Sequence, residues 1–596
     1  MKTFRKNENQ HNVKLLQGII YVMWAIFSIV LVYTLSRIML NDSFLFLGGR
    51  EQMKLNLNIC IILMVTLILY FFTLHAKISI VLGTGLLLLL DTVNYYIYSF
   101  RGTELGIADI YGMRTALNVF GDYTIRPTGT ILKCWLVWFV VMALGCGLLP
   151  KLKAKYRFAS RLFSGLIICF LLIGLVYRGS EFGVSHWSKE GTEYNGYYLN
   201  LFLDAKNSYV KKPKGYSGSK AQEVLKDYEK TGTKSKTEDA PTIIAIMNES
   251  FTDFRVLGDN FHTNKEVLPY WDSIHKNAVK GYLCSSVYGG GTANSEWEFL
   301  TGNSMNLLPA GTIVYQQYLH DHARSIVRNL EENDNYIAMA THPFQSSGWN
   351  RLNAWPYLGF QKMTFEEKYT APDLKTYRGF ISDQSMYEYI IRQYKHRDRS
   401  KNMFLFGVTM QNHGGYKKKM KEETIKLEGY HGTYPKAEQY LTMLHHSDDA
   451  LRYLLEYFKK QDDKVIVVFF GDHQPAVEPE FLEEVHGKSF DTLDELELQY
   501  KVPFMVWANY DIPEKQVKDS SINYLSNHVY QAAGIPMPAY NRFLQDMQQY
   551  IPAINSMGYY SKEEKRFKGF DEDKIGIEQK YLDEYRILEY YDIFQK

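Results

Sequence analysis

The sequence lacks the features that mark several large classes of protein. Its formal net charge at pH 7 is only +2, from 67 Lys and Arg against 65 Asp and Glu, which argues against nucleic-acid binding by whole-chain charge. Aromatic residues make up 15% and glycine only 42 of 596 positions, so the chain is neither disordered throughout nor collagen-like. It also contains no long heptad pattern, internal repeat or low-complexity tract, which excludes a coiled coil and a repeat array.

Cysteine is scarce, and its distribution is uneven. Four of the five cysteines, Cys60, Cys134, Cys146 and Cys169, lie in or beside long apolar runs of the first third. Only Cys284 belongs to the polar remainder, so that part has no internal disulfide. Because no C-x-x-C pair occurs, a zinc site built from paired thiolates is excluded as well.

The first third of the chain is predicted to be a membrane domain. Residues 1–180 carry 18 basic and seven acidic residues, whereas the remainder carries 49 and 58. Five apolar runs are predicted to span a hydrocarbon core of about 30 Å, and Asp91 is the only charged residue inside the third run. The last two runs are short, but the Lys and Arg that flank them can extend to the membrane interface. They lie between Lys14 and Arg37, Lys54 and Lys77, Ile78 and Phe100, Lys133 and Lys151, and Arg161 and Arg178. A cleavable signal peptide is the alternative for the first run, but no A-x-A-like site follows it.

The charges of the short loops predict the orientation of these helices. The N-terminal tail and the segment 151–161 are rich in Lys and Arg, whereas the loop 101–128 balances three Arg with three acids. The positive-inside rule therefore places the tail and 151–161 in the cytoplasm, and five crossings place everything after Arg178 outside a bacterial cell membrane. Asp91 is either a buried polar site or a partner for a neighbouring helix near the membrane edge.

The rest of the chain is predicted to be one large α/β domain behind a linker. We expect membrane helices in 1–178, an extracytoplasmic linker with short helices in 179–240, a catalytic domain in 241–560 and a charged helical tail in 561–596. Buried strands are predicted at 242–247, 336–340, 403–408, 465–470 and 502–507. Because helical segments such as 437–458 lie between them, a mostly parallel sheet covered on both faces is expected.

Chemically suggestive residues follow three of these strands. Glu249 comes after the predicted strand 242–247. The loop N-H-G-G with His413 follows strand 403–408, and Asp472-His473 follows strand 465–470. The carboxyl ends of parallel strands meet at one edge, so these residues are candidates for a divalent-metal site with nitrogen and oxygen ligands. A helix cap or an exposed turn would explain each one alone. A fourth candidate is Thr292, which follows three glycines. It is a nucleophile facing an anion site, a simple helix N-cap, or both at once.

The order of these motifs resembles that of the lipoteichoic acid synthase family. The five helices, N-E-S-F (248–251), the glycine-rich loop with Thr292 and G-D-H (471–473) together carry the resemblance over nearly the whole chain. It implies a membrane phosphoglycerol transferase with a sulfatase-like domain of the alkaline phosphatase superfamily. It further implies that a Mn²⁺-type ion (with Mg²⁺ and Zn²⁺ as alternatives) is held by Glu249, Thr292, Asp472 and His473 and that Thr292 is the nucleophile. Substrate-pocket roles are implied for His342, Trp349, Arg351 and His413.

The resemblance also implies the partners of the reaction. The donor is phosphatidylglycerol, and the acceptor is a polyglycerol phosphate chain, a glycolipid or a glycan at the membrane, with no nucleic acid involved. The chain departs from the polymerising synthase where Phe344 and Val477 replace an acidic residue and a serine of the pocket. These differences leave the acceptor and the length of any polymer open.

Other functions remain as alternatives. A sulfatase with formylglycine needs C/S-x-P-x-R, but Cys284 is followed by S-S-V, which disfavours it. Phosphodiester hydrolysis and phosphoethanolamine transfer share the fold, although the phosphoethanolamine transferases carry several extracytoplasmic disulfides that a lone Cys284 cannot supply. A membrane-tethered glycan-binding pseudoenzyme would suit the 46 tyrosines, but it leaves the metal ligands unexplained.

Overall fold

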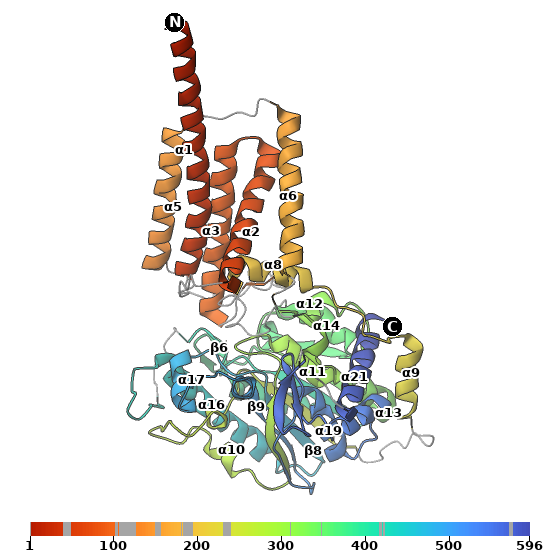
Figure 1. Ribbon diagram of the computed structural model, residues 1–596. Coiled ribbons are helices and arrows are strands. Elements are labelled where there is room, and N and C mark those ends of the chain that lie inside the picture. The colour runs from red at the N-terminus through yellow and green to blue at the C-terminus, as the bar shows by residue number, and fades with distance from the viewer. Residues whose placement is uncertain are drawn as a thin grey trace. The chain divides into compact units, whose positions relative to one another are not determined.

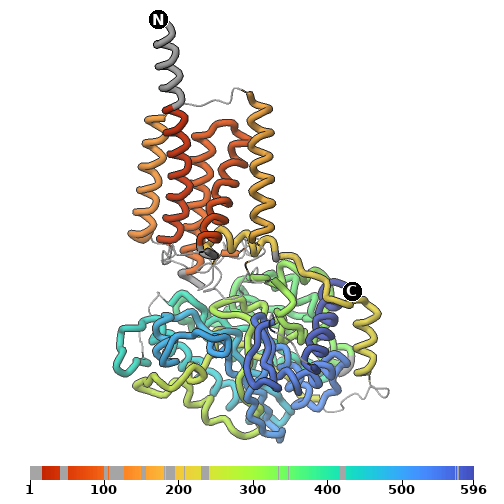
Figure 2. The backbone as a smooth tube through the Cα atoms, in the orientation of Figure 1, coloured from red at the N-terminus to blue at the C-terminus, as the bar shows by residue number. Residues whose placement is uncertain are grey.

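The protein is described from a computed structural model, shown as a ribbon in Figure 1. Two compact units make up the chain: one of residues 1–107 and 124–209, the other of 108–123 and 210–596. The structure describes the coloured parts of the backbone in Figure 2. These are residues 2–39, 49–101, 105–106, 127–149, 156–179, 182, 195–229, 240–309, 311–346, 348–416, 420, 424–570, 572 and 576–595.

The five predicted membrane helices are confirmed in the first unit, where they lie alongside one another (Figure 1). They are α1 (Lys2–Met39), α2 (Gly49–Thr73), α3 (Ala76–Arg101), α5 (Gly129–Leu148) and α6 (Arg157–Gly179). Each contains a span of 20 to 24 residues with a mean hydropathy of at least 1.8. Large apolar side chains such as Phe27, Phe139 and Phe170 are more than half exposed on the bundle, as expected for a surface that faces lipid.

Small residues allow these helices to approach one another closely. A Cβ atom at Gly145 of α5 would lie 2.0 Å from the Trp24 indole of α1, and one at Gly85 of α3 would lie 2.9 Å from Trp138 of α5. The Trp138 indole also donates a hydrogen bond to Thr84 at 3.0 Å. Packing of large side chains on glycine, supported by interhelical hydrogen bonds, is the usual way in which helices associate in lipid.

Asp91 is a buried hydrogen-bond acceptor inside this unit. The Ser36 hydroxyl of α1 donates to it at 2.9 Å, and the Tyr198 hydroxyl of helix α8 (Tyr197–Asn207) donates at 2.5 Å. A second hydrogen bond links α8 to the bundle, because the Asn58 side chain of α2 accepts from the α8 backbone. Asp91 is therefore a partner for neighbouring helices, which is one of the two roles considered for it. It is also fully buried, as the other role, a buried polar site, requires.

The second unit is built on an eight-stranded sheet, and all five predicted strands are confirmed in it. The spatial order is β10-β2-β9-β8-β1-β7-β3-β4. The strands are β1 (Thr242–Asn248), β2 (Ala278–Cys284), β3 (Tyr336–Thr341), β4 (Lys362–Thr364), β7 (Asn402–Val408), β8 (Val465–Gly471), β9 (Lys501–Ala508) and β10 (Lys515–Val517).

The expectation of a mostly parallel sheet is confirmed, with one antiparallel strand. Strands β8, β1, β7, β3 and β4 run parallel, but β9 is antiparallel to both of its neighbours, β8 and β2. A buried antiparallel strand has the same continuous apolar sequence as a buried parallel one, so its direction cannot be read from composition. The missed strands are β2, whose lysine and glycine interrupt the apolar pattern, and the three-residue strands β4 and β10.

Both faces of the sheet are covered, as predicted. Along β1, Ile243, Ala245 and Met247 belong to one buried cluster, and Ile244 and Ile246 belong to the other. The first face is covered by α11 (Thr292–Thr301), α12 (Val314–Gln317), α13 (Ile326–Asp334), α14 (Arg351–Tyr357) and α19 (Leu525–Ala533). The second is covered by α10 (Pro269–Ser273), α15 (Asp383–Lys395), α16 (Pro435–Phe458) and α17 (Pro479–His486).

The C-terminal segment belongs to a third buried cluster. The cluster contains residues of α9 (Gly218–Lys226), α20 (Ala539–Met547), β11 (Gly558–Ser561) and α21 (Gly576–Phe594). Strand β12 (Arg566–Gly569) pairs with β11 in an antiparallel hairpin. Leu582 and Tyr585 of α21 are fully buried there, together with Ala221 of α9. The segment 561–596 therefore contains a strand before its helix, and α21 is part of the core.

Candidate metal and phosphoryl-transfer site

The register of the sheet brings the candidate residues together. Strands β1 and β8 are parallel neighbours with Asn248 opposite Gly471, so Glu249 and Asp472 leave the sheet side by side. Gly471 is required at this point because a Cβ atom would lie 2.0 Å from the carbonyl oxygen of Phe251. This is the carboxyl edge of the parallel strands, where α/β sheets place their ligands.

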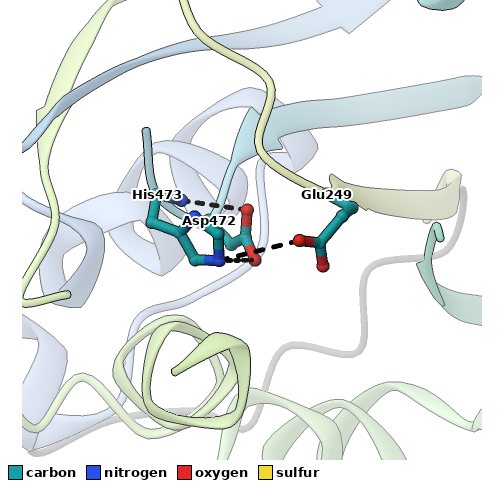
Figure 3. A group of neighbouring side chains, drawn as sticks. All are labelled: Glu249, Asp472 and His473. Carbon is teal, nitrogen blue, oxygen red and sulfur yellow. Dashed lines mark hydrogen bonds and ion pairs between the residues drawn. The ribbon is translucent and has the colours of Figure 1, made fainter. Parts of the chain in front are cut away.

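Glu249, Asp472 and His473 form a compact buried group (Figure 3). One ligand atom from each lies within 4.8 Å of the others. The Nε2 atom of His473 is 3.2 Å from Oδ2 of Asp472 and 3.7 Å from Oε1 of Glu249. All three side chains are almost fully buried.

Backbone groups orient Asp472 and His473. The N–H groups of Ser250 and His473 donate to Oδ1 of Asp472 at 2.7 and 2.9 Å. Nδ1 of His473 lies 3.0 Å from the carbonyl oxygen of Gln474, which fits a proton on Nδ1 and a lone pair on Nε2. Among the described residues, neither Oδ2 of Asp472 nor Nε2 of His473 has a hydrogen-bond partner, although both are buried.

These residues fit a divalent cation. Two buried ligand atoms, Oδ2 of Asp472 and Nε2 of His473, have no hydrogen bond and lie beside the carboxylate of Glu249. Mixed carboxylate and imidazole donors are common ligands of Mn²⁺ and Zn²⁺. Burial and the nearby Asp472 charge raise the pKa of Glu249 well above its usual value. Positive charge beside these carboxylates would offset that effect.

Thr292 lies beside this group at the first position of α11. Gly291, with φ of 89°, is the N-cap, so the hydroxyl of Thr292 does not cap the helix. Instead it donates to Oε2 of Glu249 at 3.4 Å. Of the two roles considered for Thr292, the simple cap is therefore wrong. All four predicted metal-site residues lie together.

Arg351, predicted to bind phosphate, lies in a buried ion pair with Glu296. Its Nε and Nη2 both donate to Oε1 of Glu296, at 2.9 and 2.5 Å, and the Trp355 indole donates to Oε2 at 2.9 Å. Glu296 follows Thr292 by one turn of α11. The remaining nitrogen, Nη1, lies toward Gly348. Glu296 therefore determines where the guanidinium stands.

The predicted pocket histidines lie at neighbouring strand ends. His342 follows β3 and points Nδ1 at the carbonyl oxygen of Val408, the last residue of β7, at 2.9 Å. Burial and nearby cations lower the pKa of His342 well below its usual value, and burial with Arg378 lowers the pKa of His413 to about 3. Both imidazoles are therefore neutral near pH 7. Trp349 is partly buried against the first core face, on a left-handed backbone with φ of 54°.

Sequence reasoning missed Glu296 and Arg378. Arg378 donates to the carbonyl oxygens of Gln411 and His413, and so holds the loop that carries His413. Glu296 could have been suggested by its spacing of four residues from Thr292 on one helix face. No sequence signal singles out Arg378.

Comparison with known proteins identifies this fold. Residues 241–535 match the family described as Sulfatase. The matched residues lie within the second unit, which therefore contains a sulfatase-like domain. Streptococcus pyogenes phosphoglycerol transferase GacH, solved in complex with sn-glycerol-1-phosphate, aligns with a TM-score of 0.53 and 20% identity over 65% of this chain and 96% of its own.

Two curated relatives extend the comparison. This chain is 30% identical to a putative cyclic beta-1,2-glucan modification protein of Rhizobium meliloti (strain 1021). The alignment extends over 372 residues, which is 60% of this chain. Lipoteichoic acid synthase 1 of Bacillus subtilis (strain 168) is 22% identical over 270 residues, 44% of this chain. The chain spans 55% and 41% of the lengths of these relatives. The resemblance to the lipoteichoic acid synthase family is confirmed.

Asp472→Asn tests the metal site. We expect the affinity of the full-length protein for Mn²⁺ to fall by about 100-fold or more, because the change removes a negative ligand that two backbone N–H groups orient. Mn²⁺ binding is measured by electron paramagnetic resonance of the free ion, and competition with Mg²⁺ and Zn²⁺ ranks the metals. Asp448→Asn is the control, since Asp448 is a buried carboxylate that accepts two backbone bonds at α10. Equal Mn²⁺ binding by Asp472→Asn and the wild type would contradict the site.

Proposed function

We propose that the protein transfers glycerol phosphate from phosphatidylglycerol to a hydroxyl group of an extracellular acceptor, and that it releases diacylglycerol. The acceptor is a teichoic acid chain, a glycolipid or a cell-wall glycan. The observation that carries this proposal is the position of Thr292. Its hydroxyl lies at the N-terminus of α11 and donates a hydrogen bond to Glu249. Beside it are two candidate metal ligands without a hydrogen-bond partner among the described residues, Oδ2 of Asp472 and Nε2 of His473. A hydroxyl in that position is suited to attack phosphorus.

The reaction is a double displacement. In the first step a bond forms between Thr292 Oγ1 and phosphorus, and the bond between phosphorus and the diacylglycerol oxygen breaks. The proton lost by Thr292 is recovered in the hydroxyl of diacylglycerol. A divalent cation held by Glu249, Thr292, Asp472 and His473 would lower the pKa of the Thr292 hydroxyl and neutralise charge on the phosphoryl oxygens.

In the second step the acceptor hydroxyl displaces Thr292 from the phosphoglyceryl-threonine. His413 is the base assigned to the proton of that hydroxyl, because its Nδ1 atom is buried and has no hydrogen-bond partner among the described residues. Arg351, oriented by Glu296 through two of its nitrogens, offers Nη1 to the phosphoryl oxygens. These groups bind and orient the phosphoryl group without forming a covalent bond to it.

The names of the relatives support a glycerol phosphate donor and widen the range of acceptors. A lipoteichoic acid synthase and a putative glucan modification protein are both among them. The loop charges support an extracellular location, since the basic tail and the basic segment 151–161 are retained on the cytoplasmic side. The donor, phosphatidylglycerol, is then available in the membrane that the five helices span.

The direct test uses the full-length protein in liposomes that contain phosphatidylglycerol labelled in its headgroup. We expect diacylglycerol release that requires added Mn²⁺ and stops with a chelator. Liposomes with labelled phosphatidylethanolamine in place of phosphatidylglycerol separate phosphoethanolamine transfer from the proposal. Turnover of phosphatidylethanolamine alone, or of neither lipid while Mn²⁺ is bound, would contradict the proposed donor.

A further inference from the structure

Four aromatic rings form a continuous arc beside the candidate site. The ring centroids of His342 and Phe344 are 6.1 Å apart, those of Phe344 and Phe380 are 6.2 Å apart, and those of Phe380 and His413 are 5.5 Å apart. The two histidines follow the neighbouring strands β3 and β7. The arc therefore begins and ends at the edge of the sheet that carries Glu249 and Asp472.

The arc is held in place by the short hairpin β5–β6 (Thr376–Tyr377 and Phe380–Ile381). Arg378 at its tip donates to the backbone carbonyls of Gln411 and His413 and lies 5.6 Å from the Phe380 ring. At the base of the hairpin, the N–H of Ser382 donates to the carbonyl oxygen of Lys375. The hairpin is thus fastened to the loop that carries His413.

Phe344 and Phe380 are both only half-buried, whereas His342 is almost completely buried. Two partly exposed phenylalanine rings in contact with each other leave an apolar face at the edge of a polar site. Such a face binds a flat, partly apolar group, because aromatic rings gain contact energy with little loss of conformational entropy. A polyglycerol phosphate chain is flexible and charged, and it offers no flat apolar face.

We propose that Phe344 and Phe380 form an acceptor subsite that stacks on the C–H face of a sugar ring. The proposal rests on the proposed function, in which the acceptor hydroxyl approaches the phosphoglyceryl-threonine from the side of His413. The sugar ring then lies on the phenylalanine pair while one of its hydroxyls reaches His413. In this step the bond between phosphorus and Thr292 Oγ1 breaks, a bond from phosphorus to the sugar oxygen forms, and the proton of the sugar hydroxyl returns to Thr292.

The test measures how the phosphoglyceryl group is divided between acceptors. Full-length protein in phosphatidylglycerol liposomes with Mn²⁺ is given a β-glucan oligosaccharide, with free glycerol as an acceptor that has no ring. We expect Phe344→Leu and Phe380→Leu, which keep apolar bulk but remove the ring, each to lower the ratio of glucan to glycerol product by about 3- to 10-fold. The ratio compares two products of the same reaction, so it does not depend on the rate of diacylglycerol release. Tyr377→Ala is the matched control, because the Tyr377 ring lies in the same hairpin but stacks on His446.

The possible outcomes separate this proposal from the function on which it rests. A normal product ratio in both leucine variants would overturn the subsite. Slower diacylglycerol release with a normal ratio would assign the rings to the donor lipid and would also overturn it. If the wild type releases no diacylglycerol, the proposed function fails, and the rings are tested by saturation-transfer NMR of the oligosaccharide. Binding that is lost in Phe380→Leu and retained in Tyr377→Ala would support the subsite, and equal binding by both would overturn it.

Discussion

Thr292→Ala is expected to abolish diacylglycerol release, with a fall in rate on the order of 10⁴-fold or more. The Thr292 hydroxyl is the oxygen at the N-terminus of α11 that hydrogen-bonds Glu249, and removing it leaves no oxygen to form the covalent intermediate. Thr292→Ser keeps the oxygen and should retain measurable release. Thr301→Ala is the control on the same helix, because the Thr301 hydroxyl makes local hydrogen bonds, donating to the carbonyl oxygen of Trp297 and accepting from the N–H of Asn303.

The same variants test for the intermediate. Full-length wild-type protein incubated with phosphatidylglycerol and Mn²⁺, without acceptor, should yield a peptide in which Thr292 carries a phosphoglyceryl group, as measured by mass spectrometry. Thr292→Ala should yield none. If Thr292→Ala released diacylglycerol at a rate within tenfold of the wild type, Thr292 would not be the nucleophile.

Glu296→Ala is expected to destabilise the second unit by about 3–5 kcal/mol. Glu296 is fully buried, and it is the ion-pair partner of Arg351, which is 1% exposed. Removing the carboxylate leaves a buried guanidinium without a counter-charge and leaves the Trp355 indole without its acceptor. The free energy of unfolding is measured by urea titration of the full-length protein in detergent, followed by tryptophan fluorescence.

A double variant separates charge from packing. Glu296→Leu with Arg351→Met removes both charges while keeping apolar volume, so it should be more stable than Glu296→Ala alone. Glu296→Gln keeps one acceptor oxygen for Arg351 but sets an amide NH2 group against the Trp355 indole N–H, and it leaves Arg351 with a net charge. We expect it to lower kcat because the guanidinium is held less firmly, even where the protein remains folded. A Glu296→Ala protein that unfolds at the same urea concentration as the wild type would contradict the role of this ion pair.

Much of the fold is predictable from local sequence because the signals are local. A membrane helix needs only an uninterrupted apolar run, so all five were identified from their charges and lengths. Buried strands such as β1 and β8 are short apolar runs, and the polar residues after them had to meet at one edge once the strands ran parallel. The grouping of Glu249 with Asp472 followed from that rule.

Features that depend on distant pairing were not accessible in the same way. Glu296 and Arg351 are 55 positions apart, and no local pattern indicates that the predicted phosphate ligand has a carboxylate partner. Phe344 and Phe380 meet only because the hairpin β5–β6 is fastened to the loop after β7. The direction of β9 likewise depends on its neighbours β8 and β2.

The sequence by itself determined the membrane helices, the buried strands and the residue types at the strand ends, because each depends on the polarity of a few consecutive residues. Only the tertiary structure decided that Thr292 faces Glu249 and does not cap its helix, that Arg351 is held by Glu296, and that α21 is part of the core. Those outcomes depend on contacts between residues that are far apart in the sequence. Burying a charge without a partner of opposite charge raises the free energy of the folded state, so the fold pairs buried charges across elements.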